Sequence, residues 1–260
     1  MKLIVALLLL LAACRKADSA PADDSARAAD SRCRQMLFEG SRFTVCRDPR
    51  ARVEVRTAGR DGRPFRSFAA LEHVLGHDAG RVRFAMNAGM FDADGRAIGL
   101  LIEHGRELHP INRREGGGNF HLLPNGVFLV REGGKAEIVT SAAFEPAADI
   151  AFATQSGPML VIDGKLHPAF EPDGRSRFVR NGVGIAPDGT LVFVISEDAV
   201  SFGKFARFFR DGLKCRNALY FDGSVSSLWD PVNHRMDSFA ALGPMVMAFA
   251  LEGEEGEKTR

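Results

Sequence analysis

A series of short apolar segments separated by turn residues limits how this chain can fold more than any other feature. Residues 159–162 and 191–195 have the length of strands and are too short for independent helices. Asp163-Gly164 is a turn dipeptide of the kind that closes hairpins. Residues 97–103 are predicted to form another strand. The pattern predicts a single α+β domain, with a mixed, strand-rich sheet and a few packing helices.

Two segments have helical spacing instead. Ser67 is a suitable N-cap for the first helix, and Gly76 is a suitable end. Ser201 begins the second, which carries four phenylalanines between residues 202 and 209 and ends at Gly212. This phenylalanine stripe indicates core packing rather than a ligand site. The apolar face expected for the first helix consists of Phe68, Leu71, Val74 and Leu75.

The N-terminal segment is predicted to lie outside this domain. Lys2 precedes an apolar run over residues 3–13, which is too short to span a bilayer and typical of a signal peptide. The run closes on Leu-Ala-Ala-Cys, ending at Cys14, which resembles the lipobox of bacterial lipoproteins. A plain signal peptide with a chance cysteine is the alternative. Acyl chains on Cys14 would tether the protein to a membrane face.

The rest of the chain has an ordinary composition for a globular protein. Hydrophobic residues make up 45% and charged residues 26% of it, and the formal net charge is +1. No basic stripe is present, so no nucleic-acid partner is expected. The boundaries that we predict are a signal peptide over 1–14, a disordered tether over 15–31, a folded domain over 32–252 and a solvated tail over 253–260.

Three cysteines remain after the signal segment. Cys33 and Cys46 are near enough in sequence to clip the first hairpin together by a disulfide in an oxidising compartment. Cys215 is expected to be a lone buried thiol. No His/Cys cluster has the spacing of zinc ligands, so no metal site is predicted from these residues.

Two apolar segments run directly into polar residues and a glycine. Residues 82–86 lead into Asn87 and Gly89, and residues 218–221 lead into an Asp-Gly pair. Glycine allows a sharp turn that lifts the neighbouring polar side chain from the sheet. A simple turn is the alternative for each. The polar residues after the second segment are Asp222, Gly223, Ser224 and Ser226.

These segments, taken in order, resemble those of the phosphodiester glycosidase family. Residues 87–91 resemble its Asn-Gly-Gly-Phe-Phe, residues 156–161 its Gly-Pro-x-Leu, and residues 180–185 its Arg-Thr-Ala-x-Gly. Residues 222–226 resemble its Asp-Gly-Gly-Gly-Ser, with Ser and Val in place of two glycines. The resemblance runs over about residues 84–246 and includes features of a bacterial branch.

The resemblance implies hydrolysis at the anomeric carbon of a sugar, with a phosphate-linked group leaving. Asp222 is expected to activate water or to attack the anomeric carbon, and Asp92 is the candidate for a second carboxylate. Arg180 is expected to bind and stabilise phosphate oxygens through its guanidinium. Two alternatives stay open: Asp92 closes a turn with Asp94 and Gly95, and Arg180 forms a structural salt bridge.

Other residues are expected to contact the substrate. Asn87 can hold a sugar hydroxyl, although it can equally stabilise a turn. His109 and His121 flank a glycine-rich loop over 116–119, and either can bind phosphate or transfer a proton unless it is simply packed or exposed. The substrate-binding residues predicted are Asn87, Gly89, His109, Asn119, His121, Arg180, Gly223, Ser224 and Ser226.

The sequence therefore predicts a hydrolase of the bacterial cell envelope, lipid-anchored on its periplasmic or extracytoplasmic face. Its expected substrate is a sugar-1-phosphodiester or a related linkage in envelope or exopolysaccharide glycans. No cofactor is expected; a divalent cation held by Asp92 and Asp222 is compatible with oxygen ligands but is not required by the spacing. The alternatives are a catalytically silent carbohydrate-binding lipoprotein and a metal-dependent phosphodiesterase that cuts the P–O bond.

Overall fold

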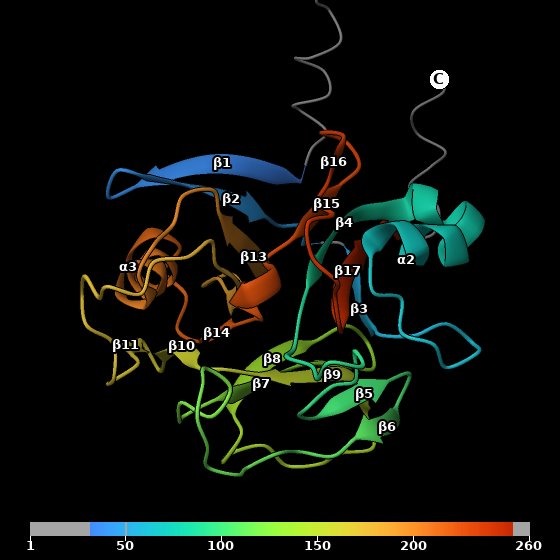
Figure 1. Ribbon diagram of the computed structural model, residues 1–260, viewed down its shortest axis with the longest axis horizontal. Coiled ribbons are helices and arrows are strands. Elements are labelled where there is room, and N and C mark those ends of the chain that lie inside the picture. The colour runs from blue at the N-terminus through green and yellow to red at the C-terminus, as the bar shows by residue number, and fades with distance from the viewer. Residues whose placement is uncertain (1–31, 50, 252–260) are drawn as a thin grey trace, which may run out of the picture.

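The computed structural model describes residues 32–49 and 51–251, which form three β-sheets and two α-helices (Figure 1). Strands far outnumber helices, so the predicted α+β class is confirmed. The predicted signal peptide, the predicted lipidation site Cys14, the predicted tether over 15–31 and the predicted tail over 253–260 lie outside the described residues. Within the described residues, no helix has the length and apolar character needed to cross a membrane.

The largest sheet has seven strands, and each strand runs antiparallel to its neighbours. The phenylalanine-rich helix α3 (Phe202–Arg207), continued by a π-helical turn (Phe208–Gly212), packs on one face and buries Phe205 and Phe209. The prediction of core packing for this stripe is therefore confirmed. In spatial order the strands are β1 (Cys33–Phe38), β2 (Ser41–Cys46), β13 (Leu191–Ser196), β12 (Asn181–Ile185), β14 (Ala218–Tyr220), β10 (Met159–Ile162) and β11 (Lys165–Leu166).

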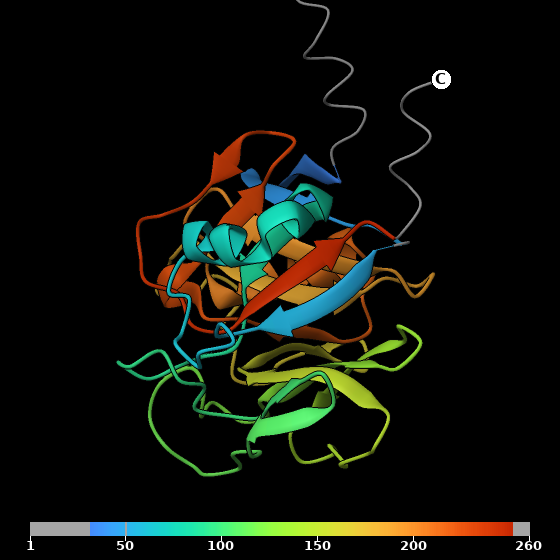
Figure 2. The same cartoon turned by 90° about the vertical axis from the view of Figure 1, so that its right-hand side faces the viewer.

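The second sheet carries helix α2 (Phe68–Leu75) on its outer face (Figure 2). Ser67 caps this helix by accepting a hydrogen bond from the backbone N–H of Ala70, and Gly76 ends it, as the sequence predicts. Val74, however, lies on the solvent side, with 55% of its surface exposed. The strands in order are β16 (Arg235–Met236), β15 (Leu228–Asp230), β4 (Val82–Asn87), β17 (Met245–Phe249) and β3 (Arg52–Arg56).

The third sheet lies below the other two in Figure 1. The strand predicted over 97–103 is shorter than expected: only Leu101–Glu103 pairs fully, whereas Ala97 makes a single bridge to Phe91. The strands in order are β6 (Arg106–His109), β5 (Leu101–Glu103), β9 (Ile150–Ser156), β7 (Gly126–Arg131) and β8 (Ala136–Thr140).

One apolar core joins the three sheets. Phe84 comes from β4, Phe128 from β7 and Phe193 from β13, so each sheet contributes one ring. The ring of Phe193 lies 5.4 Å from that of Phe84 and 6.0 Å from that of Phe128, measured between centroids. Such tilted aromatic pairs stabilise a core beyond the apolar area that they bury. The shared core brings the ends of β4, β9, β12 and β14 close together.

A disulfide joins Cys33 and Cys46, which face each other across the β1–β2 hairpin. This is the pair that the sequence predicts. Cys215 is a free and buried cysteine, and burial raises the pKa of its thiol to about 12.

Candidate active site

Two buried asparagines link the second sheet to the first. Asn87 ends β4 and Asn181 begins β12, and the side-chain amide of Asn181 donates to both the side-chain and backbone oxygens of Asn87, at 2.9 Å each. The side chain of Asn87 donates to the backbone oxygen of Asp222 at 2.7 Å and accepts from the backbone N–H of Ser227 at 2.8 Å. Asn87 therefore positions the Asp222 segment, which is the turn-stabilising alternative rather than the predicted sugar contact.

Asp222 is held by backbone bonds on both sides. Its N–H donates to the carbonyl of Ala88, and the N–H of Phe221 donates to the carbonyl of Asn181, each at 3.0 Å. The Oδ1 atom of Asp222 accepts from the N–H of Ser224 and so caps a short 3₁₀ turn (Gly223–Val225). The side chain of Ser224 also hydrogen-bonds to this carboxyl. Burial raises the pKa of this carboxyl above its ordinary value.

The side chain of Tyr220 packs against the same turn at Gly223. A Cβ atom on Gly223 would lie 1.6 Å from the Tyr220 hydroxyl oxygen, so only glycine fits at this position. The predicted substrate-binding glycine is thus required by packing. Packing also requires glycine at position 89, because a Cβ there would lie 2.2 Å from Oγ1 of Thr154. Ser226 is buried and donates to the carbonyl of Val179 at 3.1 Å, so it too is a structural part of the turn.

Arg180 neither reaches a substrate phosphate nor forms a structural salt bridge with a described residue, which were the two interpretations of the sequence. Only 1% of its surface is exposed, so its guanidinium is not accessible to a phosphate. It also forms no ion pair with a described carboxylate. Its Nε donates to the carbonyl of Val200 at 2.9 Å, and its guanidinium carbon lies 3.6 Å from the centre of the Phe202 ring.

The remaining bonds of Arg180 lead to the Asp222 turn. Nη2 donates to the carbonyl of Ser176 at 2.9 Å, and Nη1 donates to the hydroxyl of Tyr220 at 3.1 Å. Burial without a carboxylate partner lowers the pKa of Arg180. Because Tyr220 packs directly beneath Gly223, Arg180 acts on the site by fixing Tyr220, and the prediction that it binds substrate is not supported by its placement.

Asp92 is exposed and closes a turn. Its Oδ1 accepts from the N–H groups of Asp94 and Arg96, at 3.0 and 2.9 Å, and its carbonyl accepts from the N–H of Gly95. No contact joins Asp92 to Asp222 or to the asparagine pair among the described residues. The structure thus has the turn that was the alternative interpretation for Asp92.

The histidines and the glycine-rich loop form a separate region. His121 makes a 2.8 Å hydrogen bond with the carbonyl of Arg114 and packs against Gly116. His109 lies in β6 and makes a 2.9 Å hydrogen bond with the carbonyl of Pro110. Asn119 is exposed in the loop. None of these side chains hydrogen-bonds to the Asp222 network in the described part of the chain, and their contact with substrate stays a prediction.

A pocket of about 340 Å³ opens beside the Asp222 turn. Gly223, Ser224 and Ser226 form part of its wall, as the sequence predicts for substrate contacts, although Asp222 itself does not line it. The volume lies in the range of small-molecule sites. The other lining residues were not predicted from the sequence: Phe178, Val179, Ile195, Ser196, Glu197, Arg235, Asp237 and Phe239.

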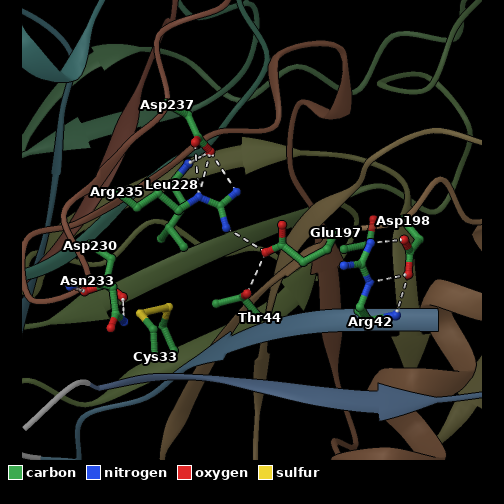
Figure 3. A network of polar contacts seen from close by, with 12 residues as sticks. Cys33, Arg42, Thr44, Glu197, Asp198, Leu228, Asp230, Asn233, Arg235 and Asp237 are labelled. Atoms are coloured by element: carbon green, nitrogen blue, oxygen red, sulfur yellow. Dashed lines mark hydrogen bonds and ion pairs between the residues drawn. A yellow bond between two sulfur atoms is a disulfide. The ribbon is translucent and has the colours of Figure 1, made fainter. Parts of the chain in front are cut away.

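Charged side chains form an ordered network in this pocket (Figure 3). Nη1 of Arg235 donates to Oε1 of Glu197 at 2.6 Å, and Nη2 donates to Oδ2 of Asp237 at 2.9 Å. Thr44 also donates to Oε1 of Glu197, at 2.5 Å. Burial disfavours the charge of Arg235, yet the bonds to Asp237 and Glu197 raise its pKa overall. No sequence signal marks these residues, because the network joins β2, the end of β13 and the β15–β16 hairpin across long separations.

The described residues contain no group of three or more His, Cys, Asp or Glu placed to hold a metal ion. Asp92 and Asp222, the pair considered from the sequence for a divalent cation, are not brought into contact. The chemistry that the site offers is therefore that of one partly buried carboxyl beside a polar pocket with two phenylalanines in its lining.

The sequence profile of the phosphodiester glycosidase family matches residues 80–242. The chain belongs to this family. The matched region is more than half of the chain and includes both asparagines, Arg180 and Asp222. Membership in the phosphodiester glycosidase family supports the predicted class, a hydrolase of the phosphodiester glycosidase type.

Similar proteins come from bacteria and from an animal. An uncharacterised Escherichia coli (strain K12) protein, YigE, is 41% identical over 150 residues, which is 58% of this chain and 59% of that protein. The match therefore spans less than two thirds of that relative's length.

Two solved structures share the phosphodiester glycosidase fold seen here. The zebrafish N-acetylglucosamine-1-phosphodiester alpha-N-acetylglucosaminidase catalytic domain, auto-inhibited by its pro-peptide, has a TM-score of 0.57 at 16% identity, covering 84% of this chain and 81% of that one. A hypothetical protein from Synechocystis has a TM-score of 0.53 at 13% identity, covering 84% of this chain and 61% of that one. At these identities the likeness concerns the fold alone.

Proposed function

We propose that this protein hydrolyses the bond between the anomeric carbon of a sugar and a phosphodiester oxygen. The observation that carries the proposal is the Asp222 turn, which Asn87 and Asn181 fix from two different sheets and which opens at Gly223 and Ser224 onto a pocket. Preorganisation of this kind is what a reacting carboxyl needs, because small displacements of a catalytic group cost large factors in rate.

Asp222 supplies the reactive oxygen in this proposal. The N–H of Ser224 bonds to Oδ1 and orients the carboxyl, and we assign Oδ2 to the reaction. A carboxyl whose pKa is raised by burial is a stronger base when ionised, so it suits removal of a proton from water or attack on the anomeric carbon. The stereochemistry of the released sugar distinguishes these two routes, because attack by Asp222 retains configuration and direct attack by water inverts it.

The phosphate side of the substrate needs positive charge, and Arg180 is too buried to supply it. Arg175 and Arg177 are exposed and form no ion pair with a described residue, and they come just before Phe178, which lines the pocket. Their guanidinium groups can make paired hydrogen bonds to phosphate oxygens. We assign the phosphate group of the substrate to this arginine segment.

Hydrolysis of hexose-1-phosphate and N-acetylhexosamine-1-phosphate methyl diesters tests the proposal. We expect the wild-type protein to release free sugar and the Asp222→Asn variant to release none. Asp188→Asn is a matched control, since Asp188 also precedes a glycine and accepts a backbone N–H two residues later, but it is exposed and lies in another turn. Full activity in Asp222→Asn would refute the assignment.

Hydrolysis in ¹⁸O-labelled water identifies the bond that breaks. Cleavage at the anomeric carbon places the label in the sugar, as we expect. Label in the phosphate would instead indicate a phosphodiesterase that cuts the P–O bond and would exclude the glycosidase proposal.

A carbohydrate-binding protein without catalytic activity is the second candidate. It is favoured by one observation, that Ser224 and Val225 replace two glycines of the family's Asp-Gly-Gly-Gly-Ser segment beside Asp222. Sugar binding by the wild-type protein with no hydrolysis of any diester in the panel would support this candidate.

We also propose that the protein acts while anchored to a bacterial membrane through Cys14, on glycans of the envelope or of an exopolysaccharide. The lipobox-like sequence before Cys14 supports this location. Cys14→Ser is expected to move the protein from the membrane fraction to the soluble fraction of cells. Retention in the membrane fraction would refute the anchor without affecting the proposed chemistry.

A further inference from the structure

We infer that the pocket beside the Asp222 turn is a sugar subsite, in which Phe178 and Phe239 stack on the sugar ring while Glu197 and Arg235 bind its hydroxyls. This inference rests on the proposed function and deepens it, because it assigns residues to the sugar. The sequence resemblance does not single out any of these four residues.

The two phenylalanines are unusual in this molecule. The chain contains 20 phenylalanines, and only Phe178 and Phe239 are exposed, by 58% and 69%. Both line the same pocket. Exposed aromatic rings gathered at a hollow mark a binding site more often than chance exposure does. The C–H face of a pyranose ring is apolar and weakly acidic, so it packs on the negative face of an aromatic ring.

Hydrogen bonds hold the backbone near both phenylalanines before any ligand arrives. Phe178 exchanges two hydrogen bonds with Val200, at 3.2 and 2.9 Å, in an isolated antiparallel bridge. The segment of Phe239 is fixed on both sides, because Asp237 N–H donates to the carbonyl of Leu228 and Leu242 N–H donates to that of Arg66. Little backbone entropy is then lost when a sugar binds, which favours affinity.

Glu197 and Arg235 complete the pocket with unused polar atoms. Both bonds to Glu197 go to Oε1, so Oε2 has no partner among the described residues and can accept from a sugar hydroxyl (Figure 3). Arg235 uses one N–H each on Nη1 and Nη2, which leaves one donor on each nitrogen. Sugar hydroxyls donate and accept, so they match this mixture.

The charge of the pocket favours a neutral ligand. Glu197 and Asp237 together carry two negative charges against the single positive charge of Arg235. A phosphate placed here would meet a net negative wall, whereas a sugar ring without charge would not. The sugar then lies between the phenylalanines, with its anomeric end at Gly223 and Ser224, and the phosphate lies outside the pocket.

The test uses Phe178→Ala, Phe239→Ala and the double variant of the full-length protein, with Phe178→Trp and Phe239→Trp as variants that keep a ring. Leu37→Ala is a matched control for loss of exposed apolar surface, since Leu37 is 72% exposed on the β1–β2 hairpin. The readouts are KM and kcat on the methyl diesters, and Kd measured by NMR titration with free hexose, free N-acetylhexosamine and inorganic phosphate.

Each alanine variant is expected to raise KM and the Kd for free sugar by about tenfold, with kcat changed by less than about twofold. The Kd for inorganic phosphate stays the same, the tryptophan variants bind like wild type, and Leu37→Ala has no effect. Because both phenylalanines are exposed, the alanine variants keep the melting temperature of the wild type.

The outcomes separate this inference from the proposed function. An active double variant with unchanged KM and unchanged Kd for free sugar would overturn the sugar subsite. The proposed glycosidase activity would still stand. If the wild-type protein binds sugar but hydrolyses no diester, and the double variant loses this binding, the sugar subsite is supported and the glycosidase proposal is refuted. A weaker affinity for inorganic phosphate in the alanine variants would overturn the assignment of the pocket to the sugar.

Discussion

Arg180 shows how one residue can be central to a site without touching the substrate. Replacing it with Met keeps much of its volume but leaves the carbonyl of Ser176 and the hydroxyl of Tyr220 without their donor. It also removes one of the two donors to the carbonyl of Val200, which keeps the N–H of Phe178. Each lost partner costs about 1–3 kcal/mol, partly offset by removal of a buried charge, so we expect a loss of about 2–4 kcal/mol in the free energy of unfolding.

Thermal unfolding followed by circular dichroism checks this prediction for Arg180→Met, with Arg175→Met as the control because Arg175 is exposed and unpaired. The melting temperature of Arg180→Met should fall by roughly 4–16 °C, and that of the control should not change. An unchanged melting temperature combined with a raised KM would instead make Arg180 a substrate ligand.

The protonation of Asp222 gives a prediction with a definite sign. Burial raises the pKa of this carboxyl in the folded protein, so its contribution to stability is full below the ordinary pKa of 3.8 and is lost as the pH rises through the folded value. Asn cannot titrate, so the Asp222→Asn variant does not lose stability through ionisation at this position. The variant should gain stability relative to wild type between about pH 4 and about pH 7 in urea unfolding.

Asp188 provides a control of opposite sign for that measurement. A hydrogen bond from the backbone of Thr190 lowers the pKa of Asp188, so its contribution is present above pH 3.8 and is lost in acid. Asp188→Asn should therefore lose stability relative to wild type as the pH rises. If Asp222→Asn behaved in this way too, the Asp222 carboxylate would be a structural group.

At the scale of single elements, the short turn after β14 depends on glycine. Gly223→Ala places a Cβ against the hydroxyl of Tyr220, which must move and weaken its 3.1 Å bond to Arg180. Overpacking of this kind costs about 1–3 kcal/mol, and displacement of the Asp222 turn should lower kcat/KM on the order of 100-fold.

The control for this substitution is Gly80→Ala, because a Cβ on Gly80 would meet no atom within 4 Å. It should change neither the melting temperature nor kcat/KM. Wild-type kcat/KM in Gly223→Ala would show that the position of this turn does not control the reaction.

The β1–β2 hairpin gives a second prediction at this scale. β1 is an edge strand that pairs only with β2, and the disulfide closes a separation of 13 residues. Replacing both Cys33 and Cys46 with Ser is expected to cost about 2–3 kcal/mol, because the unfolded chain gains conformational freedom. A reductant should lower the melting temperature of the wild type but not of the double variant, since Cys215 has no disulfide partner.

Local patterns explain which elements were predictable. Helix α2 was predicted at both ends because Ser67 and Gly76 act within a few residues of it. The strand over 97–103 was shortened because its first residues serve the Asp92 turn, a tertiary arrangement that apolar content does not reveal. Strands β15 and β16 were missed because each is two or three residues long.

The site was predictable only in part for a related reason. The sequence identified Asp222 and Asn87 as strand-end residues that meet, since turn chemistry is local and both follow apolar runs. It placed Arg180 in contact with substrate because a motif does not record burial. Glu197 and Arg235 were missed since their contact joins residues that are 38 positions apart.

At the scale of the whole molecule, the three sheets meet at a junction with two functions. The apolar side is the shared core that includes Phe84 and Phe193, and the polar side is the asparagine pair beneath the Asp222 turn. The same convergence therefore stabilises the fold and positions the site. A substitution at the polar side should therefore lower the stability of the entire domain rather than that of one loop.

Asn87→Ala tests this coupling. The substitution leaves the buried N–H of Ser227 without its acceptor, and it removes the 2.7 Å bond to the carbonyl of Asp222, which keeps only the 3.3 Å bond from the N–H of Val225. At about 1–3 kcal/mol for each unsatisfied group, we expect a loss of about 2–4 kcal/mol. Asn217→Ala is the control, because Asn217 accepts one bond from Asp163 in an exposed turn and should cost less than about 1 kcal/mol.

Hydrogen exchange distinguishes a loss shared by the sheets from a local one. If the asparagine pair joins the first and second sheets, amides in β4 and in β12 lose protection by the same factor in Asn87→Ala, since both strands open only with the junction. Loss of protection confined to β4 and β15 would show that the pair merely ends a strand. In that case the Asp222 turn would be held by its own backbone bonds, and kcat/KM would survive the substitution.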